Sequence, residues 1–152
     1  MRVQLRFTAP CSPAAAWDAI TSPAALARTY APFLTLHTED ALPDRWSPGD
    51  EVVVGLRLLG LVPVGRQLIA IRTRQRGGAR ILEDAGRPLA GPLAVVTSWR
   101  HRMAVSALPD GTTLYRDRLD VSAGVLTPLV WLALWGTWQL RAARLRRTMR
   151  RS

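Results

Sequence analysis

The stretch SWRHRMAVSALPDGTTLYRDRLDV, residues 98–121, constrains the fold more than any other part of this sequence. Residues 109–111, Pro-Asp-Gly, have the composition of a three-residue hairpin loop in which the glycine takes the left-handed position. Such a loop pairs Leu108 with Thr112. The sequence therefore predicts a β-hairpin whose register is defined along both strands.

In this register, alternate side chains point to the same face of the hairpin. One face is mostly apolar and is expected to be buried; it consists of Trp99, His101, Met103, Val105, Tyr115, Asp117, Leu119 and Val121. The other face has the composition of a solvated surface: Ser98, Arg100, Arg102, Ser106, Arg116, Arg118 and Asp120. A two-residue loop would place Val105 opposite Arg116 and mix the faces, so we reject that register.

Two ionisable residues, His101 and Asp117, fall on the apolar face in diagonal positions. Diagonal residues on neighbouring strands lie about 7–8 Å apart, within reach of these side chains. An aspartate that accepts a hydrogen bond from one imidazole nitrogen fixes the tautomer of the ring. Two interpretations stay open: an acid–base or ligand-orienting pair in a pocket, or a buried pair whose members satisfy each other. His37, in a short predicted strand, is expected to be structural or exposed.

Three helix starts share a Ser/Thr-Pro signature, at Ser12, Ser22 and Thr127. A hydroxyl at the N-cap satisfies a free backbone N–H, and a proline at the first helical position has no N–H to satisfy. The first two helices are predicted to be short and close together. The third is predicted to run from Pro128 to about Arg150.

Strand patterns fill the rest of the chain, at residues 1–8, 34–39, 51–59, 66–74 and 79–84, before the hairpin. Strands this close in sequence are expected to pair antiparallel. The long helix is the one large element able to cover an apolar face of the sheet. We expect an α+β fold in a single domain, residues 1–152: a curved antiparallel sheet of about six to seven strands, two short helices and a long C-terminal helix.

The predicted long helix has an apolar stripe at helical spacing, formed by Trp131, Leu134, Trp135, Trp138, Ala142, Leu145 and Met149. Another face carries Arg141, Arg144, Arg147 and Arg151. The stripe either packs directly on the sheet or lines a cavity between helix and sheet.

The net charge is +10, and all 21 basic residues are arginines. The absence of lysine excludes a lysine Schiff base and a P-loop lysine. Six of the arginines lie in residues 141–151, which predicts that the basic charge is largely a C-terminal feature. A single cysteine, Cys11, excludes an internal disulfide framework and a cysteine zinc cluster. With no apolar leader at the N-terminus, we expect a cytoplasmic protein.

Residues 121–140 carry no charge, which raises the question of a membrane anchor. If the helix begins near Pro128, its uncharged part spans about 20 Å, whereas a bilayer core is roughly 30 Å thick. A spanning helix is therefore disfavoured, and peripheral contact of residues 141–151 with anionic lipid at the inner membrane surface stays open. No nucleic-acid partner is expected, because the arginines lie at one end and no reading motif accompanies them. A homodimer through the helix tail or an edge strand also stays open.

The order strand, two short helices, antiparallel sheet and long C-terminal helix resembles the helix-grip fold of the START and pollen-allergen-like superfamily, also called SRPBCC, which includes polyketide cyclase-like proteins. A bacterial branch is similar in its motifs, which here read ILED (residues 81–84), Gly91-Pro92, Trp99 and His101, Gly111-Thr112, and Asp117. Met103 stands where that pattern has a second histidine, and an aliphatic residue replaces the phenylalanine before the acid.

The resemblance implies a cavity between sheet and last helix that holds a hydrophobic molecule such as a lipid, an isoprenoid or an aromatic polyketide. The expected ligand-binding residues are Trp99, His101, Met103, Tyr115, Asp117, Trp131, Leu134, Trp135 and Trp138. An alternative is a cyclase or dehydratase with His101, Asp117 and Tyr115 as catalytic candidates. A third is an interaction protein that docks on membranes through the arginine tail. No cofactor and no metal site are expected.

Overall fold

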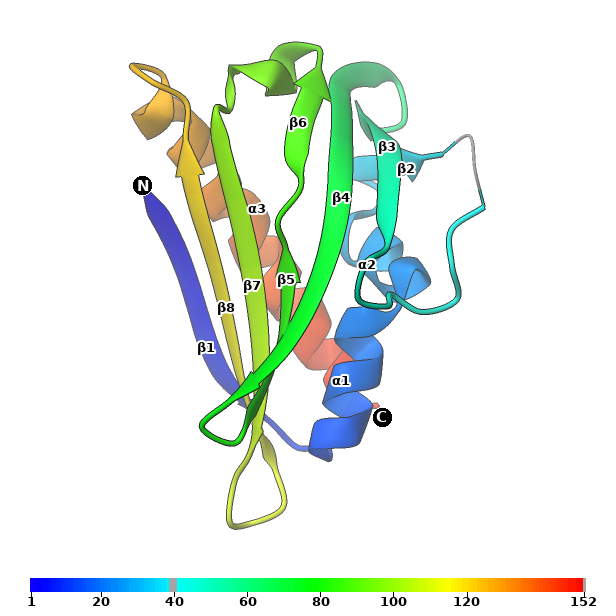
Figure 1. Ribbon diagram of the computed structural model, residues 1–152, viewed down its shortest axis with the longest axis vertical. Helices are drawn as coiled ribbons and strands as arrows, with labels where there is room; N and C mark the ends of the chain where they lie inside the picture. The colour runs from blue at the N-terminus through cyan, green and yellow to red at the C-terminus, as the bar shows by residue number, and fades with distance from the viewer. Residues whose placement is uncertain (39–40, 152) are drawn as a thin grey trace.

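The computed structural model describes residues 1–38 and 41–151, in which two short helices follow the first strand and a long helix follows the last (Figure 1). The strands are β1 (Arg2–Ala9), β2 (Leu34–His37), β3 (Glu51–Leu58), β4 (Val62–Arg76), β5 (Ala79–Asp84), β6 (Arg87–Ala90), β7 (Ser98–Ala107) and β8 (Thr113–Ser122). The helices are α1 (Pro13–Thr21), α2 (Pro23–Tyr30), the 3-10 helix η1 (Pro92–Val95) and α3 (Thr127–Met149).

The strands form one curled antiparallel sheet in the order β1-β8-β7-β5-β4-β3-β2, with β6 paired to β4 beside this path. Figure 1 shows α3 lying along the concave side of the sheet, with α1 beside the lower, C-terminal end of α3 and α2 higher up, near β2 and β3. The fold is therefore α+β of the helix-grip type, as predicted. Its curvature leaves space between the upper half of the sheet and α3, and this space is where the candidate site lies.

The hairpin of β7 and β8 has the predicted register. The Leu108 N–H donates to Thr112 O at 2.9 Å, and Gly111 has a φ of 80°. Val105 is paired with Tyr115, and Met103 with Asp117. The residues predicted to face inwards are buried except for Trp99, which is half-buried.

Two of the three predicted helix caps are confirmed. The side chains of Ser12 and Ser22 accept hydrogen bonds from the N–H groups of Ala15 and Ala25, each at 3.2 Å. The prediction for Thr127 is wrong, because Leu126 occupies the N-cap position of α3. The Thr127 hydroxyl instead secures the preceding turn, where it accepts from Ala123 N–H and donates to Gly124 O.

The strand boundaries differ from the predictions in one region. The strand predicted at residues 66–74 is longer in the structure, where β4 begins at Val62 and continues through Pro63 and Gly65 to Arg76. A register shift after Leu56 of β3 absorbs this irregularity. β6 and η1 were not predicted. The strand predicted at residues 34–39 ends at His37, and His37 is exposed. Residue 39, the last of that predicted strand, lies outside the described residues, and so does Ser152.

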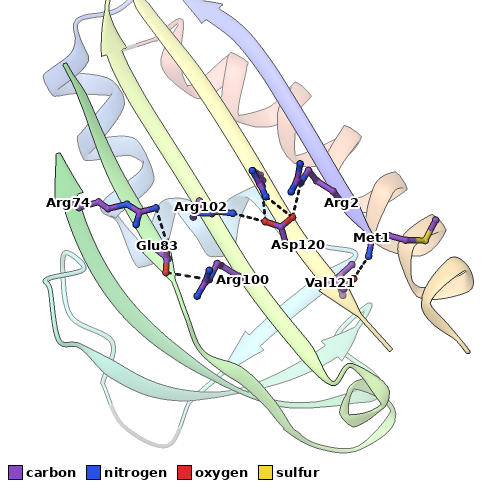
Figure 2. A network of polar contacts seen from close by, with 9 residues as sticks. Met1, Arg2, Arg74, Glu83, Arg100, Arg102, Asp120 and Val121 are labelled. Carbon is purple, nitrogen blue, oxygen red and sulfur yellow. Dashed lines mark hydrogen bonds and ion pairs between the residues drawn. The ribbon is translucent and has the colours of Figure 1, made fainter. Parts of the chain in front are cut away.

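The outer face of the sheet carries a network of arginines held by two carboxylates (Figure 2). Asp120 forms ion pairs with Arg2, Arg102 and Arg118 at 2.6–2.7 Å. Glu83 forms longer ones with the arginines at positions 74 and 100, at 3.4 and 3.7 Å. The expectation that the basic charge is largely C-terminal is therefore incomplete. Within the described chain, no helix has both the length and the apolar composition needed to cross a bilayer.

Candidate functional site

A cavity of about 450 Å³ lies between the concave face of the sheet and α3. Its wall is formed mostly by apolar side chains that β2, β3, β4, η1 and α3 contribute. Representative members are Leu36, Val54, Ile69, Leu93, Val130 and Leu134. A volume and composition of this kind are typical of sites for small apolar ligands.

The cavity opens to solvent where lining residues are also exposed. Leu58 at the end of β3 and Val95 of η1 both line the cavity and are exposed. Ala133 of α3 does the same on the helix side. The opening thus lies between the β3–β4 hairpin, η1 and the N-terminal half of α3.

Beneath the cavity, Asp117 of β8 accepts hydrogen bonds from four side chains. His101 Nε2 and Trp138 Nε1 bind Oδ1 at 2.7 and 3.0 Å. The Tyr115 hydroxyl and Arg141 Nε bind Oδ2 at 2.6 and 3.1 Å. A carboxylate that accepts several charge-assisted bonds is well compensated for its burial. This centre ties β7, β8 and α3 together.

The ionisation of Asp117 follows from these neighbours. Burial alone would raise the pKa of its carboxyl, but the charge that His101 carries when protonated and the charge of Arg141 outweigh burial, helped by hydrogen bonds from His101 and Tyr115. The pKa of Asp117 therefore lies well below the usual aspartate range. Asp117 is a carboxylate at neutral pH and can only accept hydrogen bonds.

Arg141 is the cation of this centre. It is only 3% exposed, and its three nitrogens bind Asp117, the Tyr30 hydroxyl and Met103 Sδ. Burial alone would lower the pKa of the guanidinium, but the neighbouring Tyr30, Tyr115 and Asp117 raise it well above the usual value. Arg141 is therefore charged, and the centre contains a complete ion pair inside the protein.

The orientation of His101 follows from the ionised state of Asp117. Because Oδ1 can only accept, Nε2 of His101 carries the hydrogen. The ring packs edge-on against Trp138, with centroids 5.2 Å apart. His101 lines the cavity, and Nδ1 has no hydrogen-bond partner among the described residues. In the neutral ring, this nitrogen offers a lone pair to whatever enters the cavity.

A second carboxylate, Asp84 of β5, lies on the cavity wall directly opposite His101 in the sheet register. Its Oδ1 accepts from Ala70 N–H and Gly86 N–H, and its Oδ2 accepts from Trp99 Nε1 at 3.2 Å. Asp84 is thus fully engaged in holding the wall. Residues 1–38 and 41–151 contain no group of three or more His, Cys, Asp or Glu side chains placed to hold a metal ion.

Two further polar groups reach the cavity. Gln67 of β4 lines it and is only 7% exposed, and its side-chain amide has no hydrogen-bond partner within the described chain. The Tyr30 hydroxyl also lies on the wall and accepts from Arg141, which leaves its own hydrogen free to donate. Burial raises the pKa of Tyr30, so the hydroxyl keeps that hydrogen.

Residues 8–149 match the family described as a domain of unknown function, DUF8410. The chain belongs to the DUF8410 family. No curated protein matches it.

Solved structures share the fold of this DUF8410 chain at low sequence identity. Hypothetical protein jhp0584 from Helicobacter pylori is 13% identical, with a TM-score of 0.71 and coverage of 99% of this chain and 88% of that one. Protein CV1439 from Chromobacterium violaceum is 14% identical, with a TM-score of 0.67 and coverage of 98% and 96%. Ara h 8.0201 is 12% identical, with a TM-score of 0.63 and coverage of 98% and 97%. These likenesses establish the helix-grip architecture.

The DUF8410 structure separates the predicted ligand-binding residues into three groups. Trp99, His101, Leu134 and Trp138 line the cavity. Met103, Tyr115 and Asp117 lie in the packed interior and do not line the cavity, although Asp117 contacts the wall residues His101 and Trp138. The other two predicted residues, Trp131 and Trp135, do not line the cavity.

Trp135 does not lie on the cavity wall, where it was expected. Trp135 is 45% exposed, because successive helical residues are rotated by about 100° and its neighbour Leu134 faces the cavity. Trp131 packs beside the first strand, where its indole donates to Arg2 O at 2.8 Å. Two of the four tryptophans predicted for the cavity wall therefore lie elsewhere.

Sequence reasoning missed three residues of the site: Tyr30, Gln67 and Arg141. Arg141 was grouped with the other arginines of residues 141–151, for which contact with lipid was left open, but it is buried against Asp117 and takes no part in that surface. The signal was present, since Arg141 follows Trp138 by one helical turn. Gln67 has the same strand parity as the buried Ile69 and could have been found from it.

Proposed function

We propose that this protein binds a small apolar molecule that carries one polar group in the cavity between the sheet and α3. The observation that carries the proposal is Gln67, a residue only 7% exposed in a mostly apolar wall, whose side-chain amide faces no hydrogen-bond partner in the described chain. An amide without a protein partner on a cavity wall can anchor a polar group of a ligand, and one net hydrogen bond contributes about 0.5–1.5 kcal/mol. A ligand with a hydroxyl or carbonyl oxygen would supply the missing partner.

The other polar groups on the wall favour the same ligand chemistry. The Tyr30 hydroxyl can donate and His101 Nδ1 can accept, while the surrounding wall is apolar. A fatty acid or alcohol, an isoprenoid alcohol or an aromatic polyketide combines such an apolar body with a polar group. The likeness to START and SRPBCC proteins supports these classes by fold analogy.

The test is native mass spectrometry of freshly purified protein, with organic extraction of what co-purifies, followed by titration with oleic acid, farnesol and an anthraquinone. Gln67→Leu keeps the side-chain size and removes the amide. We expect it to weaken binding of a retained probe by about tenfold, the value of one net hydrogen bond. Gln75→Leu, on the exposed part of the same strand, is the matched control. Failure of all three probes to bind, with no co-purifying molecule, would overturn the proposal.

A second candidate function is proton-transfer catalysis of the cyclase or dehydratase type. The observation that favours it is the hydrogen bond between His101 and Asp117, which holds this cavity-lining ring through Nε2 and leaves Nδ1 available as a base. The extracted ligand, incubated with protein in D₂O, would then take up deuterium, and His101→Asn would abolish the uptake while binding persists. Binding without deuterium uptake or product formation would leave the carrier function alone.

A further inference from the structure

Large exposed apolar side chains gather around the mouth of the cavity. They lie on the β3–β4 hairpin, on η1 and on the first half of α3, which Figure 1 places at the upper end of the molecule, away from the C-terminus. We call this surface the mouth rim. Large contiguous apolar surfaces on a protein mark contact with another partner.

On the hairpin side, the mouth rim consists of Leu58, Leu59, Leu61 and Val62. Leu61 is 78% exposed. Hairpin loops normally carry glycine, asparagine, aspartate or serine, because those residues suit the backbone and the solvent. Stability of the fold therefore does not explain four large apolar residues at the end of one hairpin, and contact with a partner would.

The backbone at this hairpin strengthens the argument. Leu61 N–H donates to Leu58 O at 3.0 Å, and the two central residues, Leu59 and Gly60, have φ angles of 52° and 74°. Turns with two positive φ angles favour Asn-Gly, and a leucine in the left-handed region is strained. The chain thus places leucine where asparagine would be more stable and more soluble.

On the helix side, the mouth rim consists of Val125, Leu126, Leu129, Leu132 and Trp135. Leu129 is 68% exposed and lies one turn before Ala133, which lines the opening. The opposite face of the same helix packs inwards through Leu134 and Trp138. A helix that is apolar on all sides is normally covered on all sides.

The charged residues near the mouth rim distinguish between two possible partners, a second copy of this chain and a lipid bilayer. No carboxylate occurs between Glu51 and Glu83, or after Asp120, so the hairpin and α3 carry arginines as their charged side chains. Arg57 and Arg66 are exposed on the strands of the hairpin. Two copies meeting through this surface would bring arginine toward arginine without a carboxylate from either element. An anionic bilayer offers phosphate to the arginines and acyl chains to the leucines, and tryptophan suits its interface.

We propose that the mouth rim docks on the surface of an anionic lipid bilayer, with the cavity opening toward the acyl chains. The hairpin leucines and the outer stripe of α3 insert at the level of the headgroups, and Arg57 and Arg66 contact phosphate. This docking does not depend on the cavity being occupied. It places the membrane contact at the start of α3 and not at the arginine-rich end of the helix.

The experiment measures co-sedimentation of the whole protein with vesicles of phosphatidylcholine alone and of phosphatidylcholine with phosphatidylglycerol. We expect preferential binding to the anionic vesicles that weakens at high salt. Leu61→Asp and Leu129→Asp are each expected to lower the affinity by at least about tenfold, because each removes a side chain that inserts. Ala107→Asp, exposed at the end of β7 near the opposite end of the molecule, is the matched control and should bind like the unmodified protein.

Leu59→Asn separates docking from folding. It creates the preferred Asn-Gly turn, so the melting temperature is expected to rise by about 2–4 °C while vesicle binding falls. No binding of the unmodified protein to anionic vesicles would overturn the proposal, as would full binding by all three rim variants. A concentration-dependent dimer that Leu61→Asp abolishes would overturn it in favour of a second copy as the partner.

Discussion

Arg141 and Asp117 form an ion pair inside the protein, with Nε 3.1 Å from Oδ2 and both side chains almost fully buried. The pair joins α3 to β8, and the same carboxylate holds His101 on the cavity wall. One buried charge pair thus connects the position of the helix with the orientation of the imidazole. Predictions for the fold and for the site both begin from this contact.

Removing the cation should destabilise the protein more than its apolar packing suggests. Arg141→Met keeps a side chain of similar length but leaves the Asp117 carboxylate buried without a cation. Breaking a buried pair in this way costs about 3–5 kcal/mol of unfolding free energy. Arg147→Met, an exposed position on the same helix, should change it by less than about 0.5 kcal/mol. Urea denaturation of both variants measures the difference, and equal effects would show that the pair contributes little.

Acid should remove the contribution of Asp117. Its folded pKa lies below the value near 3.9 of an unfolded aspartate, so the ionised carboxylate stabilises the fold above that pH. The contribution is lost as the pH falls through the lower folded pKa, because the unfolded chain binds the proton first. The Asp117→Asn variant should therefore have a lower free energy of unfolding than the unmodified protein at pH 7. The difference between the two free energies should decrease below about pH 4. Denaturation curves that stay parallel over this range would contradict the assignment.

The hairpin shows how much of the fold was predictable. Its loop composition and strict alternation are local signals, and together they determined the β7–β8 register and the diagonal contact of His101 with Asp117. The helix caps at Ser12 and Ser22 are local signals of the same kind. Features that depend on only a few neighbouring residues could therefore be predicted from the sequence.

The site was less predictable because it depends on contacts between distant elements. Arginine is usually exposed, and the spacing of Arg141 from Trp138 places it on the inner side of the helix without indicating that Asp117 will lie against it. The outward direction of Trp135 depends on how α3 is rotated about its axis, which packing against the sheet decides. β6 is short and pairs across an irregular part of β4, so its pattern carries little signal.

Gly86 should not tolerate a side chain. A Cβ at this position would lie 1.8 Å from Leu68 O, so the strand next to Asp84 would have to move. Gly86→Ala is expected to cost at least about 1–3 kcal/mol. Gly136→Ala is the control with the opposite sign: it lies in α3 with open space around its Cβ and should stabilise the helix by about 0.5–1 kcal/mol. Thermal unfolding of both variants tests the local packing at each position.

Two valines can test whether the cavity is open. Val54 and Val105 are each 1% exposed and both belong to the apolar core, but only Val54 lines the cavity. In Val54→Phe the new ring can occupy the cavity, so the free energy of unfolding should stay within about 1 kcal/mol of the original value. In Val105→Phe the new ring overpacks the core, which should lower the free energy of unfolding by about 1–3 kcal/mol. Val54→Phe should also reduce the binding of oleic acid or farnesol, because it occupies the volume that either molecule needs. Equal destabilisation by both substitutions would mean that the cavity is filled in solution.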